Sequence, residues 1–501
     1  MKYLYKYMTI GNLFAFLLAS IIITTSCTDL TESVNNEVEA SEFLQNEDEI
    51  ISSLGDGYGP MAGSSGPGFG SSGGFAALNE LTSDEAVITA WIDGGWEDGG
   101  VWIRLHEHTF AVTDPAIEEA WNDLFAGVNN ANRLIFQFES IIEEGGDEEL
   151  LAPFIAEMRA LRAFYYYLLL DNFGNVPIIT SFEDVQENPA QPSSNFEEGR
   201  QEMFNFVESE LLASLNDVTT EVNSTIGRIN KWVVHAILTR LYLNAEVYTG
   251  TPRWEDAIFH ADQIINSANF SLVDNYSSLF AVDNIGSPEH IFVIPYDEVF
   301  NPGFNHIIMS HLQAGAQEAF NLGQQPWGGY STVTEFYASY IDSDQNPGPQ
   351  GTVIGTDSLG RETTGTLDDR LSNFVVGPLL DQQGNQVEDP GATDLDPDGI
   401  PINHTPWLRD LVDDLRQSGG RLSKYEIEIG LSGANMNNDM VVFRLAEIIL
   451  NRAEALWRLD SGSEEALRLV NLIRSRAGVD PFTNLTSKNL LAERGRELFF
   501  E

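Results

Sequence analysis

The chain has 501 residues, of which 43% are hydrophobic and 11% aromatic, a composition that supports a large buried core and argues against a disordered protein. Its 26 basic and 76 acidic residues give a formal net charge of -50. Nucleic acid and anionic lipid headgroups are also negative, so the charge argues against both as partners. A single cysteine excludes an intramolecular disulfide.

The amino terminus has the pattern of a secretory signal. Two lysines precede an apolar run of about 14 residues at 10–23, which matches a signal-peptide core and is too short to span a bilayer. Small residues then lead to Cys27, as in a lipobox, although Thr24 stands where leucine is usual. We predict a lipoprotein signal peptide at 1–26 and lipidation of Cys27; an ordinary cleaved signal is the alternative.

A polar and glycine-rich stretch follows. Residues 55–74 are rich in Gly, Ser and Pro, which are typical of loops. We therefore predict that residues 27–77 form a tether and a Gly-rich loop without regular structure.

Residues 78–268 are predicted to be helical. Asp114 and Pro115 fit the N-cap and first position of a helix that Gly145 and Gly146 end, and Pro153 fits the first turn of the next helix. Apolar residues at helical spacing then predict a third helix between 195 and 215 and a helical hairpin over 229–265, which is similar to tetratricopeptide (TPR) repeats.

Residues 269–501 are predicted to be loop-rich first and helical afterwards. From about 269 to 436 helical periodicity fades, and short apolar runs at 291–294 and 374–376 predict small strands. The stretch 440–478 is predicted to form two helices, the first including Val441, with a capping box of Ser461 and Glu464 between them. Gly478 fits a left-handed C-cap.

Several segments together carry a family resemblance. They read EMRALRAFYYYLLLDNFGNVP (157–177), GGRLSKY (419–425), FRLAEIILNRAEAL (443–456) and EALRLVNLIRSRAGV (465–479). These segments resemble the RagB/SusD family of nutrient-capturing surface lipoproteins of Bacteroidetes-type bacteria. The resemblance implies a mostly α fold, in which a TPR-like helical-repeat scaffold carries a long loop-rich insertion and minor short strands. Family members continue past the motif at 493–497, so we expect that this chain is a fragment or a truncated gene product.

The resemblance also implies a function. Such a protein is lipid-anchored in the outer membrane, faces the cell exterior, binds oligosaccharide or polysaccharide without breaking bonds, and delivers it to a SusC-like TonB-dependent transporter. A RagB-type peptide binder is the alternative, and a surface glycoside hydrolase is a third possibility. Enzyme signatures are scarce: His106-Glu107-His108 lacks the second histidine of a zinc-protease motif, although the two histidines would share one face of a strand and could bind a metal.

Two aromatic clusters are candidate glycan contacts, because the flat faces of sugar rings stack on indole and phenol rings while nearby carboxylates bind hydroxyl groups. Glycine neighbours are expected to leave the rings of Trp91, Trp96 and Trp102 accessible, and packing of the rings against backbone is the alternative for both clusters. The candidates are Trp91, Asp93, Trp96, Asp98 and Trp102 in one cluster, and Trp327 and Tyr330 in the other.

No cofactor is required by this reading, but a calcium site is a weaker hypothesis. Asp394, Asp396 and Asp398 alternate and are followed by glycine, as at the start of an EF-hand loop. Thr405 stands where that loop needs a bidentate glutamate. An acidic surface turn is the alternative.

Overall fold

The computed structural model describes residues 44, 46–182, 190–341, 353–356, 362–364, 368–396 and 400–501. The predicted signal peptide and Cys27 lie outside these residues. The chain divides into two compact units, Met1–Ile50 and Ile51–Glu501. The following description concerns the second unit.

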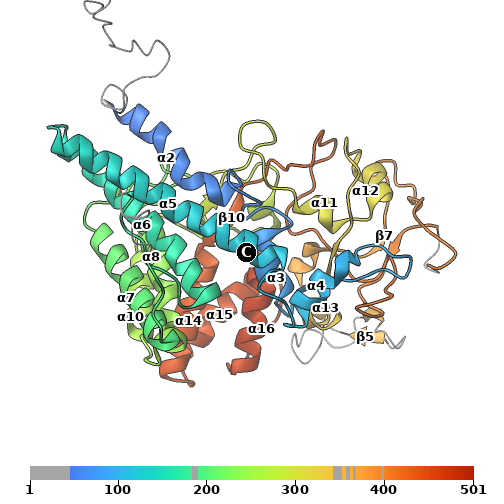
Figure 1. Ribbon diagram of the computed structural model, residues 1–501. Helices are drawn as coiled ribbons and strands as arrows, with labels where there is room; N and C mark the ends of the chain where they lie inside the picture. Colours follow the sequence, from blue (N-terminus) through green and yellow to red (C-terminus); the bar gives the residue numbers. More distant parts are fainter. Residues whose placement is uncertain are drawn as a thin grey trace, which may run out of the picture. The chain divides into compact units, whose positions relative to one another are not determined.

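A helical scaffold occupies one side of this unit (Figure 1). In it α5 packs on α6, α6 on α7, α8 on α10, and α10 on α14, which in turn packs on α15. The last helices of the chain therefore complete a stack begun by residues far earlier in the sequence. Its members are α5 (Pro115–Glu143), α6 (Glu148–Phe173), α7 (Phe196–Ser214), α8 (Lys231–Leu243), α9 (Ala245–Thr249), α10 (Trp254–Ile265), α14 (Leu445–Leu459), α15 (Glu464–Arg476) and α16 (Ser487–Leu498).

The other side contains short helices and two-stranded antiparallel sheets between long loops (Figure 1). The strand pairs are β1 with β3, β2 with β10, β4 with β5, β6 with β9, and β7 with β8. The helices are α3 (Gly74–Leu81), α4 (Val101–His106), α11 (His306–Ser310), α12 (Gln313–Phe320) and α13 (Thr334–Ile341), with 3-10 turns η1 (Asp98–Gly100), η2 (Tyr276–Phe280) and η3 (Asp369–Asn373). The strands are β1 (Ala86–Ile88), β2 (His290–Ile294), β3 (Tyr330–Thr332), β4 (Val353–Thr356), β5 (Glu362–Thr364), β6 (Phe374–Val375), β7 (Gly377–Pro378), β8 (Asn403–His404), β9 (Arg421–Leu422) and β10 (Met440–Arg444). The mostly α fold with minor strands is confirmed.

The helix boundaries mostly follow the predicted capping residues. Pro115 begins α5, and the Asn195 side chain accepts hydrogen bonds from the first turn of α7. Pro153, however, lies inside α6 rather than in its first turn. That helix begins earlier because the Asp147 carboxylate accepts a hydrogen bond from Leu150 N at 3.2 Å.

The prediction of a loop over 55–74 is wrong at both ends. Helix α2 (Glu47–Ala62) runs through the first part, and α3 begins at Gly74. Leu54 and Met61 are buried, and a Cβ at Gly57 would lie 3.0 Å from the Leu161 side chain of α6. Glycine thus lets two helices approach closely, so here it is a packing residue rather than a turn residue.

The start of the carboxy-terminal hairpin also differs from its prediction. Met440–Arg444 is strand β10, which pairs with β2, so Val441 belongs to a strand and the helix begins at Leu445. The cap of α15 is Ser463, whose hydroxyl accepts a hydrogen bond from Ala466 N at 3.2 Å, and not the predicted box of Ser461 and Glu464. The strand at β2 and the left-handed Gly478, with φ of 72°, are as predicted.

A buried ion cluster connects the helical scaffold to the loop-rich side. Glu497 of α16 pairs with Arg370 of η3 at 3.0 Å, with Arg444 of β10 at 2.5 Å, and with Arg476 of α15. The side chains of the cluster are at most 5% exposed. Its members are Glu289, Asp368, Arg370, Arg444, Arg474, Arg476, Glu493, Arg496 and Glu497.

Candidate functional site

The pairing of β1 with β3 brings the two aromatic clusters together. Ile88 lies opposite Tyr330 in this antiparallel pair. The chain that leaves β1 therefore runs beside the chain that enters β3. As a result, the indole Nε1 of Trp96 donates a hydrogen bond to the carbonyl oxygen of Trp327 at 3.2 Å. Two segments that the sequence shows as separate clusters form one surface, which we call the Trp96–Trp327 platform.

The first loop of the platform needs glycine and left-handed backbone. Trp91 N donates to Gly95 O at 2.8 Å, which closes a tight turn. A Cβ at Gly95 would lie 2.5 Å from the Trp91 ring, so a larger residue would displace that ring. Trp96 itself has φ of 60°, an unusual value for a residue with a side chain. Such strain is often found at ligand-binding loops.

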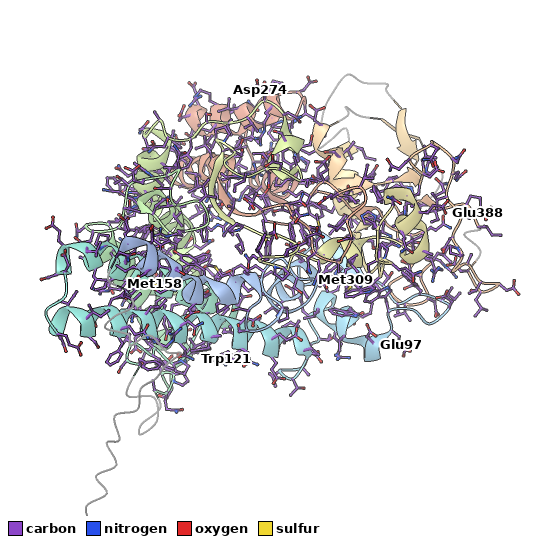
Figure 2. All side chains as sticks on the ribbon, turned by 90° about the horizontal axis from the view of Figure 1, so that it is seen from above. Glu97, Trp121, Met158, Asp274, Met309 and Glu388 are labelled. Carbon is purple, nitrogen blue, oxygen red and sulfur yellow. The ribbon has the colours of Figure 1, made fainter. Side chains whose placement is uncertain are left out.

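The second loop is held against α11. Both Trp327 N and Gly328 N donate to the carbonyl oxygen of Ile308. Gly328 has φ of 72°, and a Cβ there would lie 2.2 Å from His311 O, so only glycine fits. Met309 is buried. It lies close to the platform, because a Cβ added at Gly329 would touch both Met309 and Trp96. Figure 2 shows Met309 and Glu97 on the same side of the unit as Glu388.

The aromatic candidates differ in accessibility. Trp327 is 40% exposed, and Trp96 and Trp102 are half-buried. Trp91 is only 4% exposed, so the expectation that glycine neighbours leave this ring accessible is wrong, and Tyr330 is fully buried.

The physical reason is packing on the inner face of the platform. The Tyr330 hydroxyl donates to Ser72 O at 3.2 Å inside the fold. Trp91 belongs to an apolar cluster against which Trp96 also packs. The other buried members of that cluster are Leu312, Ala319, Leu379, Val387 and Ile402.

The polar candidates occupy two different settings. Asp98 is exposed, and its Oδ2 accepts a hydrogen bond from Trp102 Nε1 at 2.8 Å, which orients that indole at the rim. Asp93 is largely buried, and its carboxylate lies 3.4 Å from the Arg416 guanidinium. Asp98 is therefore available to ligand hydroxyl groups, whereas Asp93 supports the loop.

Arg416 is a supporting residue that the sequence reasoning missed. Its guanidinium pairs with Asp93 and also with Asp389, at 3.1 Å, and lies 4.6 Å from the centre of the Trp91 ring. A Cβ at Gly391 would meet the guanidinium on its other side. These partners are far apart in the sequence, and no spacing motif identifies them before the fold is known.

The predicted calcium ligands are not gathered into a visible site. Asp394 is exposed, whereas Asp396 is buried and accepts a hydrogen bond from Arg416 N at 3.0 Å. Asp398 lies outside the described residues. Among the residues that the structure describes, no group of three or more His, Cys, Asp and Glu side chains is placed to hold a metal ion.

The two neighbouring histidines do not share a strand face. His106 is the last residue of α4, and His108 follows it with φ of 55°. His108 Nε2 is 2.8 Å from Thr82 O, a hydrogen bond that fixes the ring at the end of α3. The strand geometry assumed for a metal site is therefore wrong.

No helix within the described ranges is long and apolar enough to cross a bilayer.

Comparisons with known proteins agree with this architecture. A family described as "SusD family" matches residues 288–501, and one described as "Starch-binding associating with outer membrane" matches residues 75–243. The starch-binding protein SusD of Bacteroides thetaiotaomicron is 25% identical over 467 residues, which cover 84% of this chain and 74% of that protein.

Solved structures show the same fold. A SusD superfamily protein from Parabacteroides distasonis superposes with a TM-score of 0.67 at 17% identity, over 91% of this chain and 86% of that chain. A laminarin-binding SusD-like protein superposes with a TM-score of 0.64 at 20% identity, over 91% of this chain and 89% of that chain. The two matched family regions contain the platform, the buried ion cluster and every scaffold helix except α9 and α10, and the chain belongs to the SusD family.

Proposed function

We propose that this protein binds an oligosaccharide or polysaccharide at the Trp96–Trp327 platform. The observation that carries the proposal is the direct contact between Trp96 and Trp327, which joins two partly exposed indoles on one rigid surface. Indole rings stack on the flat faces of sugars, and the exposed Asp98 at the rim can accept hydrogen bonds from hydroxyl groups. The printed names of two relatives, one starch-binding and one laminarin-binding, support the same class of ligand.

The proposal includes delivery of the glycan to a partner. The protein would be anchored in the outer membrane through a lipid on Cys27, face the cell exterior, and pass its ligand to a SusC-like TonB-dependent transporter. Support comes from the lipobox pattern and from the matched family described as associating with the outer membrane. Purification of the protein from outer membranes of its host, followed by mass spectrometry, tests this: a co-purifying TonB-dependent transporter is expected, and its absence would contradict the delivery step.

Binding without hydrolysis is part of the proposal. Glycoside hydrolysis needs two free carboxyl groups that flank the scissile bond. Next to the platform, Asp93 and Asp389 are both paired with the Arg416 guanidinium, so this acidic pair is not free to act as acid and base. Incubation with a glycan that binds should therefore release no reducing sugar. Release that is lost in Asp98→Asn would favour the hydrolase alternative.

Titration calorimetry against matched glycan and peptide panels tests the site. Trp96→Ala and Trp327→Ala should each weaken glycan binding by roughly 2 kcal/mol, about thirtyfold, as for a central aromatic contact. Phe259→Ala is the control, because Phe259 is 57% exposed on α10, in the scaffold. Unchanged affinity in both tryptophan variants would remove the site from the platform. Binding of peptides in place of glycans would favour the RagB-type alternative.

A further inference from the structure

We propose that the platform takes an uncharged glycan and discriminates against polyuronates and sulfated polysaccharides. The inference rests on the proposed glycan-binding function and adds the chemical class of its ligand. It follows from how the charges around the platform are arranged.

The acidic residues beside the aromatic rings are open to solvent. Glu97 directly follows Trp96 and is exposed, as is Asp98. Figure 2 shows Glu97 at the edge of the unit, on the same side as Met309. A ligand that covers the Trp96 ring therefore comes close to two carboxylates, which repel uronate and sulfate groups.

Two arginines that contact this loop, Arg416 and Arg104, are already engaged. Arg416 is 8% exposed and faces two carboxylates, those of Asp93 and Asp389, so this group of three side chains carries a net negative charge. Its guanidinium also lies 4.6 Å from the centre of the Trp91 ring and close to Gly391, so it is held in place by several contacts.

Arg104 is held in a similar way. Its Nε and Nη2 donate to the two carboxylate oxygens of Asp114, at 3.1 and 2.6 Å, and its Nη1 donates to Gly99 O at 2.7 Å. The bidentate pair fixes the guanidinium against Asp114. Binding of an anionic sugar by this arginine would require breaking three good hydrogen bonds.

The charge of the whole protein acts in the same direction. With a formal net charge of -50, the protein slows the approach of a polyanion at every distance shorter than the screening length. A neutral glycan feels no such barrier, because stacking and hydroxyl hydrogen bonds do not depend on net charge. The discrimination against anionic glycans should therefore weaken in high salt.

Derivatives of one glucan test the inference without changing the sugar backbone. Laminarin and starch would be titrated as the parent polymer, as a hydroxyethyl derivative and as a carboxymethyl derivative, at about 20 and about 500 mM salt. We expect the carboxymethyl form to bind at least about tenfold more weakly than the hydroxyethyl form at low salt, with a smaller difference at high salt. Because the two substituents are similar in size, this difference isolates charge.

A charge reversal at the site tests the local contribution. Glu97→Lys should shift the affinity ratio of carboxymethyl to hydroxyethyl polymer toward the anion by several-fold, and Glu97→Gln by less. Glu255→Lys makes the same change in net charge on exposed α10, away from the platform, and should leave the ratio nearly unchanged. An equal shift in both lysine variants would overturn the local role.

The outcomes separate this inference from the function on which it rests. Tighter binding of polygalacturonate, alginate or the carboxymethyl polymers than of neutral glucans would overturn the uncharged class but leave glycan binding intact. Binding of peptides with no glycan bound would remove both.

Discussion

The helical scaffold and the loop-rich side of this protein are held together in different ways. In the scaffold, neighbouring helices bury apolar stripes, as where α8 packs on α10 and α5 on α6. On the loop-rich side, residues distant in sequence meet in the apolar cluster around Trp91 and through charged side chains, as where Arg416 joins Asp93 and Asp389. The proposed binding site lies on the loops, where the helical scaffold supports a surface whose geometry depends on long-range contacts.

The largest effect on stability should come from a substitution in the buried ion cluster, which joins the two regions. Glu497→Gln removes a buried carboxylate that pairs with three arginines, and the loss of one partner in a buried ion pair costs roughly 3–5 kcal/mol. Urea unfolding measures this as a lower midpoint. Arg468→Gln removes an exposed pair with Glu465 and should cost less than about 1 kcal/mol. Equal effects of the two substitutions would contradict the proposed difference between the regions.

The next largest effect should come from a substitution that changes the backbone of the platform. Gly328→Ala forces a side chain into a backbone with φ of 72° and places its Cβ 2.2 Å from His311 O. Strain of this kind costs about 1–3 kcal/mol, and relaxation should displace Trp327 and lower glycan affinity. Gly462→Ala is the control, because that glycine lies in an open turn of the scaffold. Retained glycan affinity in Gly328→Ala would show that the loop geometry is not needed.

Acid should destabilise both regions through buried histidines. Burial lowers the pKa of His235 to about 3 and of His260 to about 4 in the scaffold, and the pKa of His306 and His311 to about 3 on the other side. The folded state binds fewer protons than the unfolded state, so this stability is present above about pH 6.5 and is lost as the pH falls toward these values.

The pair in the scaffold allows this to be measured. His235 and His260 share a hydrogen bond between their Nδ1 atoms at 2.8 Å. The double variant His235→Phe and His260→Phe should reduce the slope of unfolding free energy between pH 6.5 and 4, whereas the exposed His108→Gln should not. An unchanged slope in the double variant would contradict the account.

A further loss of folding stability should begin at lower pH. Three arginines, Arg370, Arg496 and Arg474, hold the pKa of Glu493 at about 2 against the opposing effect of burial. The stability that this carboxylate contributes is present above about pH 4.5 and is lost as the pH falls toward 2. Glu493→Gln should remove that part of the acid dependence, as measured by unfolding at pH 5 and below.

The smallest effect should be that of calcium. Asp396 already accepts the hydrogen bond from Arg416 N, so we expect calcium and a chelator to give the same melting temperature. A clear rise in melting temperature with calcium would instead identify the acidic turn as a metal site.

Prediction from sequence succeeded where structure is local. The start of one helix at Pro115, the helix between 195 and 215 and the helical stripes depend on neighbouring residues, and the structure confirms them. The sequence predicts a helix for residues 440–444, because a short apolar run fits the 3.6-residue period of a helix as well as the two-residue period of a strand. Their partner strand β2 lies far away in the sequence and decides the outcome.

The site was predictable only in part for the same reason. Aromatic residues beside glycines pointed to both loops of the platform, but the accessibility of each ring depends on distant partners. Trp91 is covered by an apolar cluster that includes Ile402, and Tyr330 bonds to Ser72. The supporting role of Arg416 likewise exists only once three distant segments have met.

A structure of the protein with a bound neutral oligosaccharide tests the central claim most directly. The account predicts a sugar ring stacked on the Trp96 and Trp327 indoles, with a hydroxyl group within hydrogen-bond distance of Asp98. A sugar bound elsewhere would contradict it, for example in the cavity of about 310 Å³ lined by Tyr58, Ile226 and Pro295, with both indoles left uncovered.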